Sequence, residues 1–374
     1  MASTRDDALN LPLNLPLDLT LDAAELTRRL CDVQSVSGDE KPLADAIEEA
    51  LRRLGHLEVL RDGDAVVART RLGRSERVVL AGHIDTVPVA GNLPVRLEGD
   101  TRTGVLHGRG TVDMKGGVAV QLRTAATVVE PNRDVTYVFY DNEEVDSDRN
   151  GLGRLARLHP EWIGGDFAVL LEPSNAGVEG GCNGTMRVDV VTTGLAAHSA
   201  RAWRGRNAIH EAGRVLTRLQ AYEPREVEVD GLVYREGLNA VHIRGGIAGN
   251  VIPDRCVVSV NYRFAPDRSV ADAEHHLREL FGGYEMVVAD AAAGARPGLD
   301  HPAAAAFVAA LGTVPAPKYG WTDVARFSEL GIPAVNFGPG DPSLAHADDE
   351  HCPAEQIHAC ERAMRSWLTS PAGA

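Results

Sequence analysis

The chain has 374 residues, of which 44% are hydrophobic and 24% carry a formal charge. This length exceeds a single typical hydrophobic core, so we expect two domains. The formal net charge of −15 disfavours nucleic acid and anionic membranes as partners. No run of the sequence approaches the roughly 18 apolar residues that a membrane helix needs, and the amino terminus lacks a signal-peptide pattern. We therefore predict a cytoplasmic protein.

The cysteines are five in number, an odd count, and they are widely spaced along the chain. No two of them have the Cys-x-x-Cys spacing of a redox or zinc-thiolate motif. We predict reduced and mostly buried thiols rather than a disulfide framework.

The first part of the chain is predicted to contain packing elements. Residues 1–20, which include LPLNLPLDL, show no hydrophobic periodicity and are predicted to form a loosely held arm. Regularly spaced leucines predict a helix that begins near Asp22, and a second amphipathic helix is predicted over 41–54.

A histidine and an aspartate follow the first predicted buried strand. The run RVVLA at 77–81 leads directly into His83 and Asp85. Since side-chain direction repeats every two residues along an extended chain, the imidazole and the carboxylate point to the same side. One interpretation is a metal-bound His83 with a nearby carboxylate that orients its ring. The alternative is a buried histidine with a structural role only.

A single aspartate lies in the glycine-rich loop at 108–117. Glycines on both sides of Asp113 indicate a tight backbone path, and an apolar helix is predicted over 118–129. Neither GxGxxG nor GxxxxGK[ST] is present, so the loop resembles a phosphate-binding loop only weakly. The open alternatives are a structural turn and a loop that presents Asp113 as a ligand.

Two adjacent glutamates end the predicted strand at 136–140. The sequence there continues as Asp-Asn-Glu-Glu at 141–144. The carboxylates of Glu143 and Glu144 repel each other and are costly to desolvate, so a buried position would require a compensating cation. A solvated acidic turn is the alternative.

Further candidate ligands follow two more predicted strands. Glu172 comes directly after a buried strand at 166–171, and His346 comes after a strand at 332–337. In open α/β sheets the ligand crevice lies beyond the carboxyl ends of the strands. We therefore expect the side chains that follow these strands to converge.

The donor types in these segments suit zinc. Two histidines and several carboxylates without a thiolate are ligands for one or two zinc ions, with cobalt or manganese as substitutes. If Asp113 bridges two ions, only one of Glu143 and Glu144 is needed as a ligand. The other would lie beside the attacking water, in the position of a general base.

A series of motifs resembles the two-zinc aminoacylase and carboxypeptidase-type metallopeptidases, in the order of that family and from about residue 18 to the carboxyl terminus. The motifs are GHIDTVPV at 82–89, GRGTVDMKGG at 108–117, DNEE at 141–144, LEPS at 171–174, GLAAHSARAWRGRNAIH at 194–210, GNVIPD at 249–254, NYRF at 261–264 and HADDE at 346–350.

The resemblance implies an α/β fold in which a zinc-peptidase-like catalytic domain carries an inserted α+β dimerisation domain, or lid. The catalytic domain would have a mixed central sheet flanked by helices. Strands alternate with amphipathic helices between 179 and 291, which also indicates a separate domain. We predict a discontinuous catalytic domain of 1–178 and 292–374 and an inserted domain of 179–291.

The resemblance also implies a ligand set for two zinc ions. His83 and Glu172 correspond to ligands of one ion, and Glu144 and His346 correspond to ligands of the other. Asp113 corresponds to the ligand that bridges both.

Other roles follow from the same resemblance. Asp85 corresponds to the residue that orients His83, and Glu143 corresponds to the general base. The family also has a cis peptide bond after the bridging aspartate. The HADDE motif favours His346 over the nearby His351 as the ligand.

In the inserted domain, His198 resembles the family histidine that reaches the active site of a partner subunit and stabilises the oxyanion. Arg263 and Asn250 match positions that contact substrate. Without the resemblance, His198 would be interpreted as a turn histidine and Arg263 as an ordinary surface residue. The resemblance implies a homodimer.

The motifs are most similar to the branch of the family that hydrolyses N-succinyl-L,L-2,6-diaminopimelate to succinate and L,L-diaminopimelate in lysine biosynthesis. The predicted partner is a small N-acyl amino acid, and the predicted cofactors are two Zn²⁺ per chain with Co²⁺ as a substitute. One alternative is a related deacylase for acetylornithine, another N-acyl amino acid or a dipeptide. The other is a non-catalytic dimeric metal-binding scaffold.

Overall fold

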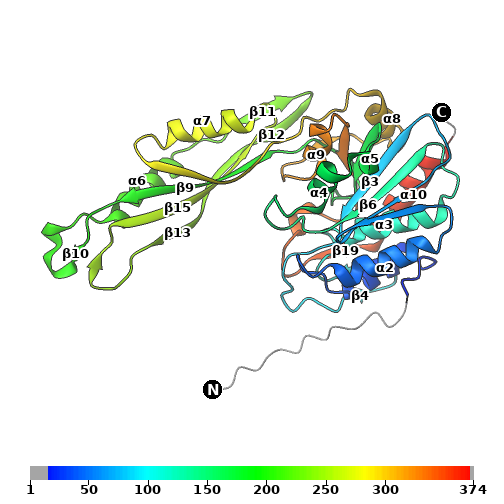
Figure 1. Cartoon of the computed structure of the whole chain (residues 1–374), viewed down its shortest axis with the longest axis horizontal. Helices are drawn as coiled ribbons and strands as arrows, with labels where there is room; N and C mark the ends of the chain where they lie inside the picture. The colour runs from blue at the N-terminus through cyan, green and yellow to red at the C-terminus, as the bar shows by residue number, and fades with distance from the viewer. Residues whose placement is uncertain (1–15, 371–374) are drawn as a thin grey trace, which may run out of the picture. The chain divides into compact units, whose positions relative to one another are not determined.

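The computed structural model describes residues 16–370 and divides them into two compact units (Figure 1). Unit 2 contains Gly181–Pro297 and Pro317–Ala325, and unit 1 contains the remaining described chain. The predicted inserted domain, 179–291, ends before Pro297, the last residue of the first segment of unit 2. It also does not include the second segment, Pro317–Ala325.

An eight-stranded mixed sheet forms the centre of unit 1. Its strands are β1 (Glu58–Asp62), β2 (Ala65–Arg69), β3 (Arg77–His83), β6 (Asp134–Tyr140), β7 (Phe167–Leu170), β8 (Glu179–Gly180), β17 (Ala316–Pro317) and β18 (Ala334–Asn336). Their order is β1-β2-β6-β3-β7-β18-β8-β17. The central strands β6, β3, β7 and β18 are parallel, whereas β1, β2 and β8 pair antiparallel to their neighbours.

The four central strands correspond to the strands that the sequence predicted at 77–81, 136–140, 166–171 and 332–337. Along β3, Val78 and Leu80 face one hydrophobic core, while Val79 and Ala81 point to the opposite face, and all four are buried. Strands covered on both faces have continuous apolar runs, which is why these segments lack polar alternation.

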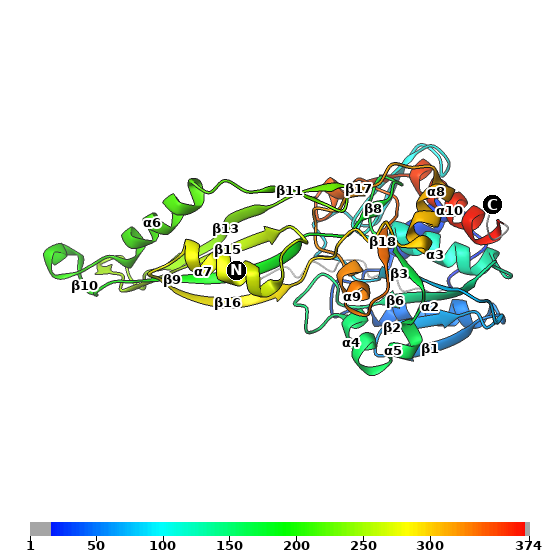
Figure 2. The ribbon, with the colours of Figure 1, turned by 90° about the horizontal axis from the view of Figure 1, so that it is seen from above.

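Helices cover both faces of this sheet. The helices of unit 1 are α1 (Ala23–Asp32), α2 (Lys41–Arg52), α3 (Lys115–Thr127), α4 (Gly151–Leu158), α5 (Pro160–Ile163), α8 (Pro302–Leu311), α9 (Val324–Glu329, which begins in unit 2), α10 (Ala354–Thr369) and the short 3₁₀ helix η2 (Pro342–Leu344). In Figure 2, α3 and α10 lie on one side of β3 and β6, and α4 and α5 lie on the other. Both helices predicted before residue 55 are confirmed.

The predicted amino-terminal arm is wrong for its last residues. Residues 1–15 lie outside the described part of the chain, but Leu17 and Leu19 are buried in the core of unit 1. Their carbonyls accept hydrogen bonds from Arg53 and Arg123 at 2.9 and 2.6 Å. Two leucines give too short a pattern for periodicity to detect, so only the tertiary contacts show this anchor.

A three-stranded antiparallel sheet completes unit 1. It has the order β19-β5-β4 and consists of β4 (Arg96–Glu98), β5 (Val105–His107) and β19 (His351–Pro353). The sheet joins the segment before Asp113 to the segment after His346.

Unit 2 is built on a four-stranded antiparallel sheet with the order β13-β15-β9-β16. Its strands are β9 (Gly184–Thr193), β13 (Gly237–Gly245), β15 (Arg255–Phe264) and β16 (Glu285–Ala292). The helices α6 (Ala208–Gln220) and α7 (Val270–Leu280) pack on one face, against alternate residues such as Val258 and Val260 (Figure 1). The other elements are β10 (Ala197–His198), β14 (Val251–Ile252), β11 (Glu226–Val229), β12 (Leu232–Arg235) and the 3₁₀ helix η1 (Ser199–Arg204).

All five cysteines are free and buried, as predicted; they are Cys31, Cys182, Cys256, Cys352 and Cys360. Within residues 16–370, no helix has both the length and the apolar character that a membrane crossing requires.

Candidate metal centre

Three of the candidate ligands follow adjacent strands of the parallel part of the sheet. His83 is the last residue of β3, Glu144 follows β6, and Glu172 follows β7. Parallel strands end at the same edge, so their following residues lie together there. Asp113 comes from the loop before α3, and His346 comes from the loop after η2.

The side chains of these segments form three groups that share members. Within each group, the possible ligand atoms lie within 4.8 Å of one another. The groups are His83, Asp113 and Glu172; His83, Glu143 and Glu144; and Asp113, Glu144 and His346. The structure therefore brings together every residue that was predicted to bind metal, with Glu143 beside them.

The two oxygens of Asp113 face two different histidines. Oδ1 lies 3.1 Å from Nε2 of His83, and Oδ2 lies 3.3 Å from Nε2 of His346. On the side of His346, both oxygens of Glu144 lie within 3.0 Å of the same Nε2 atom. On the side of His83, Glu172 Oε1 lies 4.0 Å from Nε2. One carboxylate thus belongs to two groups of donors, which is the arrangement of a bridging ligand.

The surroundings of His83 fix which ring nitrogen is free to bind metal. The ring is buried, and its Nδ1 lies 3.1 Å from the backbone carbonyl of Asp85 and 3.4 Å from Asp85 Oδ1. Both neighbours are acceptors, so we assign the Nδ1 proton to this side. Nε2 is then the nitrogen that faces Asp113 and Glu172, and it is the one left to bind a metal ion, as is usual for metal-binding histidines.

Asp85 also holds the turn that carries the two glutamates. Its Oδ1 accepts the main-chain N–H of Glu143 at 3.0 Å, and its Oδ2 accepts the N–H of Glu144 at 3.1 Å and the hydroxyl of Ser37 at 2.7 Å. Asp85 is fully buried and therefore depends on these donors. One carboxylate consequently orients both His83 and the Glu143–Glu144 turn.

Two further buried carboxylates, which were not predicted from the sequence, hold the ligand loops. Glu40 accepts the N–H of Asn142, a residue in the left-handed conformation, at 3.1 Å. Glu350 accepts the N–H groups of Val112 and Asp113 at 2.9 and 3.1 Å. Both glutamates belong to polar runs, SVSGDE and HADDE, that pattern alone describes as a turn and a solvated tail.

The charges of the cluster shift the pKa values of its members. Burial would raise the pKa of Asp113, but its contacts with His346 and His83 hold that pKa well below its usual range. Asp113 and Glu144 together raise the pKa of His346 to about 10. Burial and the nearby Asp113 raise the pKa of Glu144. Burial would lower the pKa of His83, but Asp113 and Asp85 raise it. The metal-free cluster therefore holds protons where cations would be favourable.

The choice between the two tail histidines is clear from the geometry. His346 has a left-handed backbone with φ 65° and points Nε2 at Asp113 and Glu144. His351 instead stacks on His107 with ring centroids 5.2 Å apart, and its Nδ1 contacts the carbonyl of Asp349. The peptide bond between Asp113 and Met114 is cis, as the resemblance implied.

The three candidate residues of unit 2 do not lie together. His198 is the last residue of β10, and Asn250 directly precedes β14, the strand that pairs with β10. The N–H of Ser199 donates to the Asn250 carbonyl at 2.9 Å. Arg263 lies near the other end of β15. The eight residue-to-residue steps from Arg255 to Arg263 span roughly 27 Å at about 3.4 Å per step. His198 and Asn250 are therefore neighbours, and Arg263 is remote from them within unit 2.

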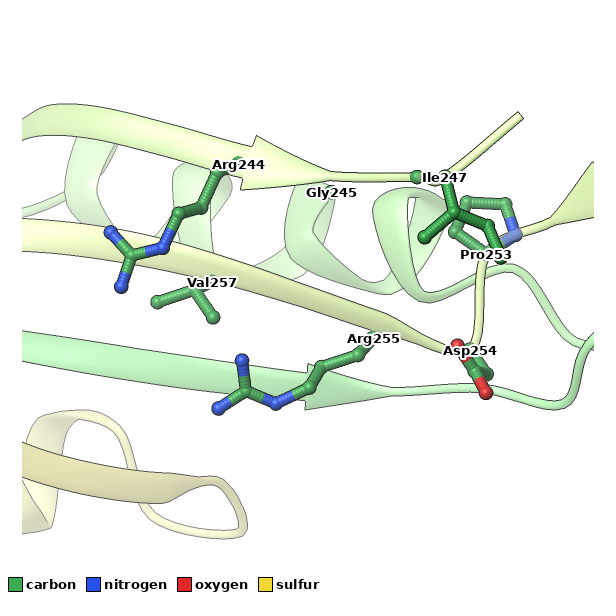
Figure 3. A pocket seen from close by; sticks show the side chains of 8 residues that line it. Arg244, Gly245, Ile247, Pro253, Asp254, Arg255 and Val257 are labelled. Atoms are coloured by element: carbon green, nitrogen blue, oxygen red, sulfur yellow. The ribbon is translucent and has the colours of Figure 1, made fainter. Parts of the chain in front are cut away.

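A cavity of about 280 Å³ lies in unit 2, next to the loop after β13 (Figure 3). Arg244 and Arg255 line it and point the same way from adjacent strands, with Val257 between them. Arg244 donates to Asp189 at 2.6 Å. None of the predicted site residues lines this cavity, so we assign no part of the catalytic chemistry to it.

The donor set of the cluster fits divalent metal ions. Its three groups contain four carboxylates and two imidazoles, and no thiolate. Nitrogen and oxygen donors of this kind suit zinc, with cobalt or manganese as substitutes. The carboxylates, which are buried or half-buried, outnumber the histidines, so positive charge in the cluster is favourable.

Comparison with known proteins agrees with this arrangement. The model of Peptidase family M20/M25/M40 matches residues 79–370. Over 350 residues the chain is 55% identical to a Mycobacterium tuberculosis protein with the provisional name succinyl-diaminopimelate desuccinylase, covering 93% of this chain and 98% of that protein. It is 46% identical over 372 residues to succinyl-diaminopimelate desuccinylase of Corynebacterium glutamicum, covering 96% and 100% of the two chains.

A solved structure shares the fold. A Bacillus subtilis protein described as a dinuclear metal binding peptidase of the M20 family aligns with a TM-score of 0.68 at 18% identity, over 92% of this chain and 96% of that one. At this identity the likeness shows the fold alone.

The mixed sheet and the convergent nitrogen and oxygen donors define a hydrolase of the metallopeptidase class, which acts on amide bonds. The chain belongs to peptidase family M20/M25/M40. The predicted fold class and enzyme class are confirmed, and the alternative of a non-catalytic scaffold is dropped.

Proposed function

We propose that the chain hydrolyses N-succinyl-L,L-2,6-diaminopimelate to succinate and L,L-diaminopimelate at a centre that holds two zinc ions. The observation that carries the metal centre is Asp113, whose two oxygens face His83 and His346 separately. The substrate is supported by the names of the two relatives at 55% and 46% identity, each matched over nearly its full length.

The proposed ligands divide into two sets that share Asp113. His83 and Glu172 would hold one ion, and Glu144 and His346 would hold the other, in line with the observed groups. When bound, the ions would supply Lewis-acid polarisation of the amide carbonyl and would lower the pKa of water toward neutrality. Co²⁺ is a suitable substitute because it accepts the same donors.

Glu143 is the proposed general base. Its main-chain N–H is held by Asp85, and its carboxylate lies within 4.8 Å of ligand atoms of His83 and Glu144. It would take a proton from the attacking water and deliver that proton to the departing amine. The turn directs the neighbouring glutamate to His346. The pair therefore supplies one base and one ligand.

We further propose that unit 2 forms a homodimer through the edge strand β13 and helix α6. Val241 and Ile243 on β13 are exposed, as are Ile209 and Leu216 on α6. An edge strand with unpaired backbone groups and apolar side chains is suited to pairing with a second copy of itself.

The dimer would bring His198 and Asn250 to the active site of the partner. These residues lie at the end of the unit 2 sheet away from the junctions at Gly181 and Pro297, where the chain enters and leaves the unit. His198 would stabilise the oxyanion, a contribution that is worth about 3 kcal/mol for one donor in well-studied enzymes. Arg263, at the junction end, would bind a substrate carboxylate in bidentate fashion.

The substrate is tested by measuring kcat/KM for N-succinyl-L,L-2,6-diaminopimelate, acetylornithine, other N-acyl amino acids and dipeptides with the zinc-loaded chain. We expect the succinyl substrate to exceed the others by at least tenfold. A higher value for acetylornithine or a dipeptide would assign the chain to the alternative deacylase function.

The shared site is tested by mixing two inactive variants, His198→Ala and Glu143→Ala. A mixed dimer contains one site with an intact base and an intact histidine from the partner, so up to about a quarter of wild-type activity should return after subunit exchange. Failure to recover activity, although exchange is demonstrated by mass spectrometry, would place His198 outside the partner's site.

A further inference from the structure

We propose that Glu350 is a positioning residue of the metal centre, which ties the loop of the bridging Asp113 to the segment of His346. Its carboxylate is fully buried. Oε1 accepts the N–H groups of Val112 and Asp113 at 2.9 and 3.1 Å, and Oε2 accepts from Arg109 at 2.8 Å. Glu350 thus holds the backbone of Asp113 itself.

The same residue is joined to the histidine segment through the main chain. Glu350 lies four residues after His346 and donates its N–H to the carbonyl of Ala347 at 3.3 Å. Arg109 donates to this same carbonyl at 3.1 Å, and the N–H of Gly108 donates to the Glu350 carbonyl at 2.9 Å. The two ligand segments, separated by more than two hundred residues in sequence, therefore form one hydrogen-bonded unit.

A carboxylate at position 350 is needed because both of its oxygens must accept. The donors around it are two amide N–H groups on one side and a buried guanidinium on the other, and none of them can accept. Glutamine has one accepting oxygen and would leave a donor facing a donor. Aspartate keeps the charge but is one methylene shorter, so it cannot reach both sides.

The position of Asp113 matters for both ions, since each of its oxygens faces a different histidine. A shift of its backbone would move both oxygens together. Outer groups that orient metal ligands typically change metal affinity by about 10- to 100-fold when they are replaced. We expect that loss for Glu350, although no atom of its side chain lies among the predicted ligands.

The test compares Glu350→Asp with Asp349→Asn in the full-length metal-free chain. Asp349 is the exposed neighbour, so its variant changes the charge of the same segment without touching the loop. Zn²⁺ affinity is measured by chelator competition, and the coordination geometry is followed by the visible absorption of the Co²⁺-loaded chain. Urea unfolding of each metal-free variant establishes that it is folded.

E350D should bind at least one of the two ions about 10- to 100-fold more weakly and should change the Co²⁺ spectrum, while D349N should do neither. Wild-type affinity and an unchanged spectrum in E350D would overturn the proposal. An equal loss in D349N would overturn it as well, because a change at the exposed neighbour, which leaves the carboxylate of Glu350 in place, would then have the same effect. If E350D does not fold, E350Q is judged by the same two measurements.

This inference rests on the proposed metal centre but not on the proposed substrate. Metal binding is measured without substrate, so the two can fail separately. A wild-type chain that binds two ions but does not hydrolyse the succinyl compound would reject the substrate and leave the role of Glu350 in place.

Discussion

Replacing Asp85 by asparagine tests how the metal ligands are held. Each oxygen of Asp85 accepts from two sides: Oδ1 from Glu143 N and the His83 ring, and Oδ2 from Glu144 N and Ser37. Asparagine occupies the same volume but has only one oxygen. The hydroxyl of Ser37 can turn to accept, whereas the other donors cannot. The new NH₂ group should therefore face Ser37 and the N–H of Glu144.

The expected cost follows from that geometry. One half-buried main-chain N–H, that of Glu144, loses its acceptor, which costs about 1–3 kcal/mol. If this cost destabilises the metal-bound state, the metal affinity of the site with Glu144 and His346 should fall by about 5- to 140-fold.

The assay for D85N is chelator competition with Zn²⁺, combined with urea unfolding of the metal-free chain. Ser37→Ala is the matched control, since it removes one donor to Asp85 and leaves the carboxylate, and it should cost only about 0.5–1.5 kcal/mol. Unchanged metal affinity together with unchanged stability in D85N would refute the reasoning.

Three further predictions concern the base, the protons of the centre and the core. Glu143→Gln should lower kcat by about 10²- to 10⁴-fold with two metal ions still bound, as measured by elemental analysis; a fall in metal content would mean that the residue is a ligand. Because the pKa of His346 in the metal-free chain is about 10, its charged form stabilises that chain fully below about pH 6.5 and this contribution is lost as the pH rises through 10. Metal loading at pH 7.5 should therefore release at least one proton per chain, detectable with a pH indicator, and no release would contradict the assignment. Phe307→Ala should lower the free energy of unfolding, measured in urea, by about 3–5 kcal/mol, because this buried ring packs with its centroid 4.7 Å from that of Trp367. A loss below about 1 kcal/mol would contradict this prediction, because it would mean that neighbouring side chains fill the cavity.

The sequence predicted the elements whose signal is local. The central strands of unit 1 are short, largely apolar runs; β3 ends in His83, and β6 and β7 lead directly into the polar segments that carry Glu144 and Glu172. That pattern depends on burial of both sheet faces and is readable without tertiary coordinates. The candidate ligands were found for the same reason, since His83, Glu144 and Glu172 follow such strands.

Apart from Asp85, the sequence did not predict the residues that hold these ligands. Glu40 and Glu350 look like members of solvated acidic runs, because nothing local distinguishes a buried carboxylate from an exposed one. Leu17 and Leu19 were missed since two residues carry no periodicity. In each case the partner is more than thirty residues away in sequence.

The amino-acid sequence by itself thus determined the fold class, the enzyme class and the types of donor at the metal centre, because these follow from apolar runs and from short motifs at strand ends. Only the tertiary structure decided that Asp113 faces two histidines with its two oxygens and that the buried Asp85 and Glu350 accept the main-chain N–H groups of the ligand loops. The physical reason is that hydrogen-bond partners of buried groups are set by which distant segments meet, and a one-dimensional pattern does not contain that information.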